Sequence, residues 1–486
     1  MRTDNNSTDK TFYRSPWFWV PTLYFAEGVP YFLVNNISVM MFAKMGVPND
    51  ALSFFTTLLY FPWFLKGVWS PIVDVVKTKR WWIVSMQVLM TALCIFLTLT
   101  LPHPDAAMIS AKGTSVSLFW LTLVLFIISA FASATHDIAA DGYYMLAHDQ
   151  SSQAAFIGIR STFYRIASVF GQGVLVYIAG EVENRTGDIP WSWQVTLGVT
   201  AVVMFVITIY HIFAMPHPKD DVPRIDASGE KKDVWAELGH SFSTFFTKKG
   251  VWLAILFMLL YRLPEGFLIK LCQPFLVDAR EITFNAQGQI LGGGLGLDTR
   301  MVGLLYGTIG VIFLLLGGIA GGVFISKLGL KKSLWWMAAC MTLPCLTFVY
   351  LAVQVNYLAD PAYFNLGSLN DWLIAHDWPM EVLNYKKWLI GIALSIEQFG
   401  YGFGFTAYML YMMYFSEGEF KTSHYAICTA FMALSMMLPG FVAGKIEMAI
   451  GYVNFFWMVI ACSAGTLLVT WLAHRKVDEN YGKKTE

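Results

Sequence analysis

Charged side chains are scarce in this 486-residue chain. Only 14% of its residues are Asp, Glu, Lys or Arg, whereas a soluble globular domain has about 25%. The 33 acidic side chains balance the 33 basic ones, so the net charge is zero and nothing favours binding to nucleic acid. Apolar residues make up 56% of the chain, which indicates a protein built largely inside a lipid bilayer.

Cysteine is also sparse, with six residues in the chain. They fall in or beside apolar runs and show neither metal-ligand spacing nor a disulfide framework. We therefore expect buried thiols, no metal site and no cofactor. The sequence offers no nucleophile, base and acid together at membrane depth, so we expect no enzymatic activity and no catalytic residues.

Apolar runs long enough to cross a membrane recur along the whole chain. A helix needs about 20 apolar residues to cross a hydrocarbon core of roughly 30 Å. The polar N-terminus lacks the residue order of a cleavable signal peptide, so the first run is expected to be retained. Twelve crossings are predicted, at residues 16–43, 51–74, 81–101, 115–143, 153–180, 191–213, 251–278, 300–326, 333–355, 387–415, 423–446 and 451–473.

The longest internal polar stretch covers residues 214–250 and divides the predicted crossings six and six. We therefore expect two six-helix bundles, 1–213 and 251–486, joined by a linker. Most loop lysines and arginines fall on the side that holds both termini and this linker. The positive-inside rule then places the termini and the linker in the cytoplasm.

Several ionisable residues fall inside the predicted crossings, where a charge costs from about 2.5 to more than 10 kcal/mol. The first helix of each set of three carries an acid, and three-helix repeats would gather these helices around a central path. We expect substrate or protons to bind there. The candidate binding residues are Glu27, Asp137, Arg165, Arg262, Glu265 and Glu397.

Some of these charges have a second possible role as structural ion pairs. Asp137 and Arg165 form either a structural pair or one linked to transport, and both alternatives stay open. Lys66 can instead extend to the membrane interface, and Asp74 is expected in a structural pair. Tyrosines on or beside the lining helices either bind a sugar ring or pack helices. They are Tyr24, Tyr31, Tyr164, Tyr261, Tyr401 and Tyr408.

Two of the predicted cytoplasmic turns share a pattern. The turn after the second crossing contains Lys66, Gly67 and Asp74, and the turn after the eighth contains Gly322, Lys327 and Gly329. Both resemble the G-x-x-x-D-(R/K)-x-G-(R/K) loop of the major facilitator superfamily. The resemblance implies an all-α membrane protein with twelve helices in two halves, in which these loops brace the helices while the halves rock.

A narrower resemblance covers nearly all twelve crossings. The segment from Lys66 to Asp74 is similar to the K-x-x-W-(S/A)-P-x-x-D turn of the muropeptide permease (AmpG) group and of the acetyl-coenzyme A transporters. The segment from His136 to Gly142 resembles their Q-D-I-x-x-D-(A/G) motif, and the segment from Tyr261 to Glu265 resembles their Y-K-x-x-(D/E) motif. The resemblance places Glu265 at the position of a functionally sensitive acid.

The resemblance implies a proton-driven importer of anhydro-muropeptides or related peptidoglycan fragments. Such a protein would be a monomer in the inner membrane, with a sugar-peptide, protons and the bilayer as its partners. Acetyl-coenzyme A, another organic anion, or another glycan or peptide remains an alternative substrate. A cluster of bases in the cavity would favour an anion, and the candidate bases are Arg160, Arg165, Arg262 and Lys270.

Overall fold

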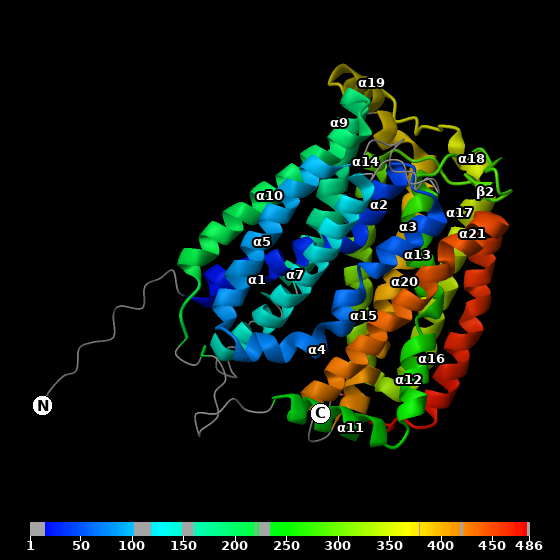
Figure 1. The fold of residues 1–486 in the computed structure, drawn as a ribbon. Coiled ribbons are helices and arrows are strands. Elements are labelled where there is room, and N and C mark those ends of the chain that lie inside the picture. Colours follow the sequence, from blue (N-terminus) through cyan, green and yellow to red (C-terminus); the bar gives the residue numbers. More distant parts are fainter. Residues whose placement is uncertain are drawn as a thin grey trace, which may run out of the picture.

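The structure is a computed structural model and is almost entirely helical (Figure 1). It describes residues 15–101, 118–147, 159–160, 162–218, 221–222, 234–378, 380–417 and 421–483. Within these ranges, eight helical stretches are long and apolar enough to cross a membrane. One of them, 424–474, bends at Gly451, whose backbone has a φ of 74°, and so makes two crossings. Three further helical runs, at 16–44, 49–75 and 385–416, bring the number of crossings to twelve.

The first half of the molecule is built from the crossings before residue 215. Its helices are α1 (Pro16–Phe32), α2 (Ser38–Lys44), α3 (Asn49–Leu58), α4 (Phe61–Val75), α5 (Lys79–Thr100), α7 (Leu118–Ala147), α9 (Val176–Thr186) and α10 (Ile189–Ala214). Helix α5 packs between α7 and α10, while α7 also contacts α1 and α4. The buried faces of α5 and α10 meet inside this half, and their exposed faces carry large apolar side chains suited to lipid.

The second half follows α11 (Val234–Thr247). Its helices are α12 (Val251–Leu260), α13 (Leu263–Val277), α14 (Thr299–Val302), α15 (Val311–Leu328), α16 (Leu330–Thr342), α17 (Leu346–Val353), α18 (Val355–Ala359), α19 (Ser368–Ala375), α20 (Tyr385–Ser416) and α21 (Lys421–His474). Two 3₁₀ turns, η5 (Leu343–Cys345) and η6 (Met380–Leu383), connect them. A small antiparallel hairpin, β1 (Thr283–Phe284) with β2 (Ile290–Leu291), lies between α13 and α14.

Among the described residues, three crossings contain a π-helical turn. These turns are η2 (Leu33–Ile37), η3 (Val169–Leu175) and η4 (Gly303–Gly310). Turn η3 contacts both η2 and η4, so it joins the two halves. Glycines allow this close approach, because a Cβ added at Gly307 would overlap the carbonyl of Gln172. The π turns are uncommon and frequently mark functional sites.

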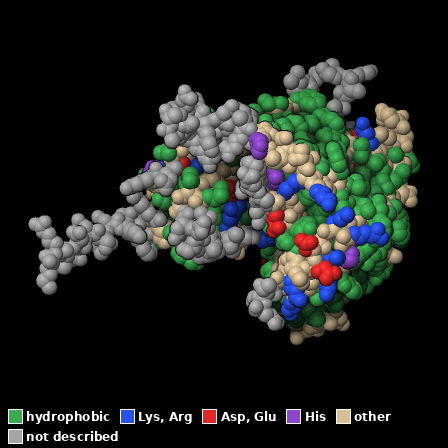
Figure 2. Space-filling view, turned by 90° about the horizontal axis from the view of Figure 1, so that it is seen from below, with side chains coloured by type: hydrophobic (Ala, Val, Ile, Leu, Met, Phe, Trp, Pro, Cys, Tyr) green, Lys and Arg blue, Asp and Glu red, His purple; other side chains and the backbone are tan. Residues whose placement is uncertain are grey.

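The two ends of the molecule are distinct. Helix α1 begins, α11 lies and α21 ends at one end of the molecule, which we call the terminal side (Figure 1). The opposite end holds residues 278–298 and 354–384, and we call it the loop side. The halves meet on the loop side, where α2 contacts α13, α3 contacts both α13 and α21, and α9 contacts α14. Figure 2 views the terminal side and shows lysines and arginines gathered on the body formed by the second half.

Candidate functional site

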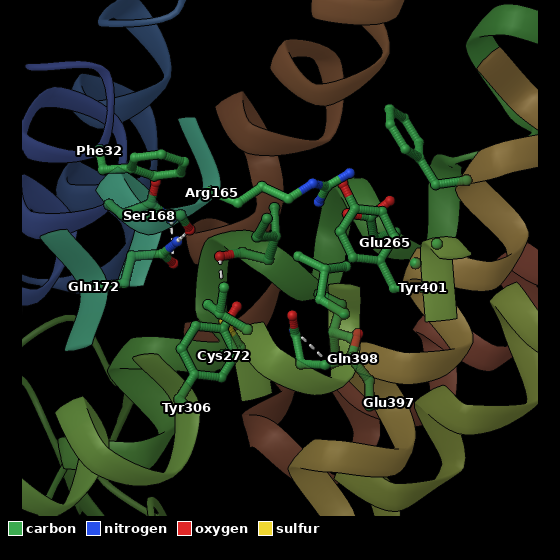
Figure 3. Close-up of a pocket in the computed structure, with 18 of the residues that line it drawn as sticks. Phe32, Arg165, Ser168, Gln172, Glu265, Cys272, Tyr306, Glu397, Gln398 and Tyr401 are labelled. Carbon is green, nitrogen blue, oxygen red and sulfur yellow. Dashed lines mark hydrogen bonds between the residues drawn. The ribbon is translucent and has the colours of Figure 1, made fainter. Parts of the chain in front are cut away.

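A cavity of about 560 Å³ lies between the two halves (Figure 3). Its walls come from both halves and combine aromatic rings with polar side chains. The tyrosines that line it are Tyr31, Tyr60, Tyr164, Tyr306 and Tyr401. Of the six tyrosines considered from the sequence, Tyr31, Tyr164 and Tyr401 line the cavity. The cavity can therefore offer both ring faces and hydroxyl groups to a bound molecule.

The π-helical turns place three polar side chains in the cavity wall. Asn36 comes from η2, Gln172 from η3 and Tyr306 from η4. Asn36 Nδ2 donates to Gln172 Oε1 at 3.1 Å, and Gln172 Nε2 donates to Ser168 Oγ at 2.9 Å. These contacts form one connected row of uncharged groups with free hydrogen-bonding capacity towards the cavity.

Glu265 lines the second-half wall and is paired with Arg262. The crossing breaks after α12, and Pro264 allows a new helix to start because its missing N–H is not needed in the first turn. Glu265 then lies one turn from Arg262, whose Nε and Nη2 donate to the two carboxylate oxygens at 3.0 and 3.3 Å. Both side chains are almost completely buried, so the pair is a desolvated, two-pronged ion pair.

Aromatic groups enclose this pair from the side of α20. Arg262 Nη2 donates to the Tyr401 hydroxyl at 2.9 Å, and the guanidinium carbon lies 4.7 Å from the centre of the Phe405 ring. The ring of Tyr408 lies 5.6 Å from the same carbon. Hydrogen bonds and ring faces thus offset part of the cost of burying the guanidinium group.

Glu397 is the second carboxylate in the cavity wall. It lies in the middle of α20 and accepts a hydrogen bond from the neighbouring Gln398 amide at 2.8 Å. Glu397 is 4% exposed, and the described residues place no cation within ion-pair distance of it. It therefore contrasts with Glu265, which has a cation bound to both of its oxygens.

Arg165 contributes a positive charge from the first half. It is half-buried and lines the cavity. Figure 3 shows its side chain extending from the first half towards Glu265 and Tyr401 on the second. In the part of the chain that the structure describes, Arg165 forms no ion pair with a carboxylate.

The remaining charges of the first half form a separate cluster. Lys66 Nζ lies 2.6 Å from Asp137 Oδ2, and Arg160 Nη2 lies 2.6 Å from Asp141 Oδ1. Glu27 is buried next to Asp137, and one of its carboxyl oxygens has no hydrogen-bond partner among the described residues. None of these charged side chains lines the cavity, so the site candidates divide into a cavity set and a first-half set.

A sequence model of the Major Facilitator Superfamily matches residues 22–370, which is more than half of the chain. The chain belongs to the Major Facilitator Superfamily. This confirms the expected all-α membrane protein of the major facilitator fold, and membership of the superfamily implies twelve crossings in two halves. Transport rather than catalysis is the activity of this superfamily, so the expectation that the protein is no enzyme is also confirmed.

Relatives over almost the full length carry the narrower resemblance. The Anhydromuropeptide permease of Escherichia coli (strain K12) is 22% identical over 475 residues, covering 95% of this chain and 81% of that protein. The Putative transporter AmpG 4 of Rickettsia felis is 22% identical over 461 residues, covering 93% and 95%. An uncharacterized protein of Haemophilus influenzae is also 22% identical, covering 94% of each chain.

Solved structures agree on the superfamily fold. A D-xylose-proton symporter superposes with a TM-score of 0.64 at 12% identity, covering 97% of this chain and 100% of the other. A POT family transporter in complex with a thioalcohol conjugated peptide gives a TM-score of 0.63 at 12% identity, covering 94% and 96%. At this level of identity the likeness concerns the fold alone.

The superfamily loop motif is only partly described. Gly67 and Asp74 belong to helix α4, but their side-chain surroundings lie outside the described residues. In the second copy, Gly322 has open space around its Cα and Lys327 is exposed at the end of α15. Gly329 has a φ of 81° and ends that helix.

The second copy of the motif contacts the C-terminal segment of the chain. Leu330 N donates to the Tyr481 carbonyl at 2.8 Å, and Lys331 lies 3.6 Å from Glu479. This contact fixes the turn between the eighth and ninth crossings against the tail that follows α21.

The structure corrects the partner of Asp137 and the expected position of Lys66. Lys66, rather than Arg165, is the partner of Asp137. Lys66 therefore forms an ion pair instead of extending to the membrane interface. Arg160 is the partner of Asp141, which leaves Arg165 facing the cavity.

The sequence interpretation missed most of the uncharged cavity lining. Asn36, Tyr60, Gln172, Tyr306 and Gln398 were not singled out, although all of them line the cavity. The available signal was an amide side chain within an apolar run, because a buried amide also needs a hydrogen-bond partner. That signal is weaker than an ionisable group, whose burial costs more.

Proposed function

We propose that this membrane transporter imports peptidoglycan fragments, such as anhydromuropeptides, by proton-driven alternating access. The observation that carries the proposal is the cavity between the halves, with tyrosine rings, amides and two carboxylates on its walls. A volume of about 560 Å³ falls in the usual range of small-molecule sites, roughly 300–1,000 Å³. The name of the Escherichia coli relative supports the choice of substrate class.

The wall chemistry suits a substrate that is part sugar and part peptide. Ring faces of Tyr31, Tyr164 and Tyr401 can pack against the apolar face of a sugar. The row formed by Asn36, Gln172 and Ser168 can bind hydroxyl or amide groups. Such a mixed wall favours a neutral body with a few polar groups over a highly charged substrate.

Charge pairing bears on the rival substrates. Acetyl-coenzyme A carries several phosphate charges and would need a cluster of free bases. Of the four candidate bases, Arg160 and Arg262 are paired with carboxylates, and Lys270 does not line the cavity. Only Arg165 remains as a free base in the described cavity wall, which makes a polyanion the weaker candidate.

We place the protein in the inner membrane, with its terminal side facing the cytoplasm. Lysines and arginines on that side support it (Figure 2). The contacts between the halves on the loop side would then close the protein towards the outside. We propose that segments 1–213 and 251–486 rock as two bodies of one monomer, joined by residues 214–250. Their motif residues Lys66, Gly67, Asp74, Gly322, Lys327 and Gly329 would brace this movement.

Proton binding is assigned to carboxylates at two places. Glu265 and Glu397 face the cavity, where a proton and the substrate would influence one another. Glu27 and Asp137 lie side by side in the first-half cluster. This cluster contains three carboxyl groups and two bases, which are Glu27, Asp137, Asp141, Lys66 and Arg160. One added proton would balance this cluster, so Glu27 is a further candidate carrier.

The experiment is uptake of labelled anhydromuropeptide into proteoliposomes with an imposed proton gradient. We expect Glu265→Gln to lose gradient-driven accumulation while still exchanging substrate between the two sides of the membrane. Full accumulation by Glu265→Gln would contradict a coupling role for Glu265. Glu281→Gln is the matched control, because Glu281 is exposed on the loop side. Competition with acetyl-coenzyme A in the same assay separates the two substrate classes.

A further inference from the structure

Arg165 differs from three other bases that lie inside the predicted crossings. Lys66, Arg160 and Arg262 each lie within 3.0 Å of a carboxylate oxygen. Arg165 has no such partner among the described residues, although it is half-buried between walls of tyrosine rings. A guanidinium group in partly dry surroundings gains stability from an anion, so this one is ready to receive an anion from outside the chain.

The second half does not supply that anion in the present arrangement. The Arg165 side chain extends towards Glu265 and Tyr401 (Figure 3). Both oxygens of Glu265 already accept hydrogen bonds from Arg262. The Tyr401 hydroxyl also accepts from Arg262. The space in front of Arg165 is therefore open to a ligand rather than filled by a protein carboxylate.

We propose that Arg165 binds a carboxylate of the transported substrate. The proposal rests on the transport function proposed above and narrows its substrate class to molecules with a free carboxylate. The planar guanidinium offers two parallel N–H groups, a geometry that matches the two oxygens of a carboxylate. A free peptide carboxylate of a peptidoglycan fragment has this chemistry.

The neighbours of Arg165 indicate which groups would flank that carboxylate. Ser168 and Gln172 lie three and seven positions after Arg165 in the same crossing, Thr162–Thr186, and all three residues line the cavity. Their row with Asn36 leaves amide N–H groups available to a carbonyl or hydroxyl oxygen. The site therefore fits a carboxylate with an amide or hydroxyl group one helical turn away.

Lys270 does not provide a second receptor of this kind in the described arrangement. It is 2% exposed, and its Nζ lies 4.4 Å from the centre of the Tyr60 ring. Tyr60 lines the cavity whereas Lys270 does not, so the ammonium group packs against a ring of the cavity wall without itself lining the cavity. Among the described residues that line the cavity, Arg165 is thus the one unpaired base that can bind a carboxylate.

The test compares an anhydromuropeptide with its carboxamide derivative, in which every carboxylate is amidated. Binding to the purified full chain is measured by calorimetry for wild type, Arg165→Lys and Arg165→Gln. We expect wild type to prefer the acid by about 10- to 100-fold, Arg165→Gln to bind both compounds alike, and Arg165→Lys to fall between them. Arg185→Gln is the control, because the Arg185 side chain is 76% exposed and pairs with Glu181.

The possible results separate this inference from the transport function. An acid preference that is equal in wild type and Arg165→Gln overturns the role of Arg165 and leaves the substrate class standing. If wild type binds neither compound, the muropeptide function fails. The same variants are then tested for thermal stabilisation by acetylated dipeptides and their amides. Stabilisation that requires the dipeptide carboxylate and is lost in Arg165→Gln supports carboxylate binding by Arg165. Equal stabilisation of wild type and Arg165→Gln overturns it.

Discussion

Lys66 and Asp137 form an ion pair with 2.6 Å between Nζ and Oδ2, and this pair joins α4 to α7 in the first half. Asp137 also lies beside Glu27. Removal of Lys66 would leave two carboxyl groups together without their nearest cation. The pair is therefore expected to govern the stability of the whole first-half cluster, rather than to act as an isolated bridge.

Lys66→Ala is expected to destabilise the protein more than the double variant Lys66→Ala with Asp137→Ala. The single change leaves the mostly buried Asp137 carboxylate without its cation, which lowers the free energy of unfolding by about 1–3 kcal/mol. The double change removes both charges. Thermal unfolding of the purified variants in one detergent measures the difference. If the two single effects simply add in the double variant, the pair is not coupled.

Glu265→Ala is expected to destabilise the protein by about 3–5 kcal/mol, because it leaves the buried Arg262 guanidinium without its carboxylate. The variant with both Arg262→Met and Glu265→Leu should recover most of that loss, since apolar side chains can replace a buried pair. Unfolding measurements test both statements. A double variant as unstable as Glu265→Ala would show that Arg262 has a second essential partner.

The sequence predicted the crossings well because lipid imposes a simple length and polarity requirement on each helix. The run 81–101 corresponds to α5 and the run 191–213 to α10, each within a few residues of the observed bounds. The acids inside the membrane were also recognisable, since few residue types cost as much to bury.

The partners of those acids could not be predicted in the same way. Whether Asp137 meets Lys66 or Arg165 depends on the rotation of three helices about their axes, and helix spacing alone does not set that rotation. The π turns η2, η3 and η4 were likewise not foreseen, because they depend on tertiary packing between the halves. For this reason Asn36, Gln172 and Tyr306 were identified only in the structure.

Gly307→Ala is expected to shift the protein towards an arrangement with the loop side open. A Cβ at this position would overlap the carbonyl of Gln172 across the contact between η3 and η4. Spin labels at positions 185 and 287, in a background without native cysteines, report the separation of the halves on the loop side. Gly198→Ala is the matched control, because nothing lies within 4 Å of a Cβ added there. An unchanged distance in Gly307→Ala would contradict the role of this contact.

Closure of the loop side is expected to weaken as the pH rises. Asp278, just beyond the end of α13, accepts hydrogen bonds from the Tyr452 hydroxyl at 2.6 Å and from the Asn49 amide at 3.3 Å. Asn49 belongs to the first half and also donates to Glu447 at 2.9 Å, so this contact joins the halves around two carboxyl groups. Within the described residues, no cation forms an ion pair with Asp278. The bases nearest in sequence are Arg280 for Asp278 and Lys445 for Glu447. Asp50, next to Asn49, adds a further carboxylate.

Burial raises the pKa of the Asp278 carboxyl above its ordinary value of 3.8, although the hydrogen bonds from Tyr452 and Asn49 act in the opposite direction. An acid whose pKa is raised by closure takes up a proton on closing. Closure is therefore fully stable below the ordinary pKa and loses stability as the pH rises through the raised pKa. The distance between labels at positions 185 and 287 should accordingly increase between pH 4 and 8, and Asp278→Asn should remove much of this dependence. The same pH profile in Asp278→Asn and wild type would assign the effect to another group.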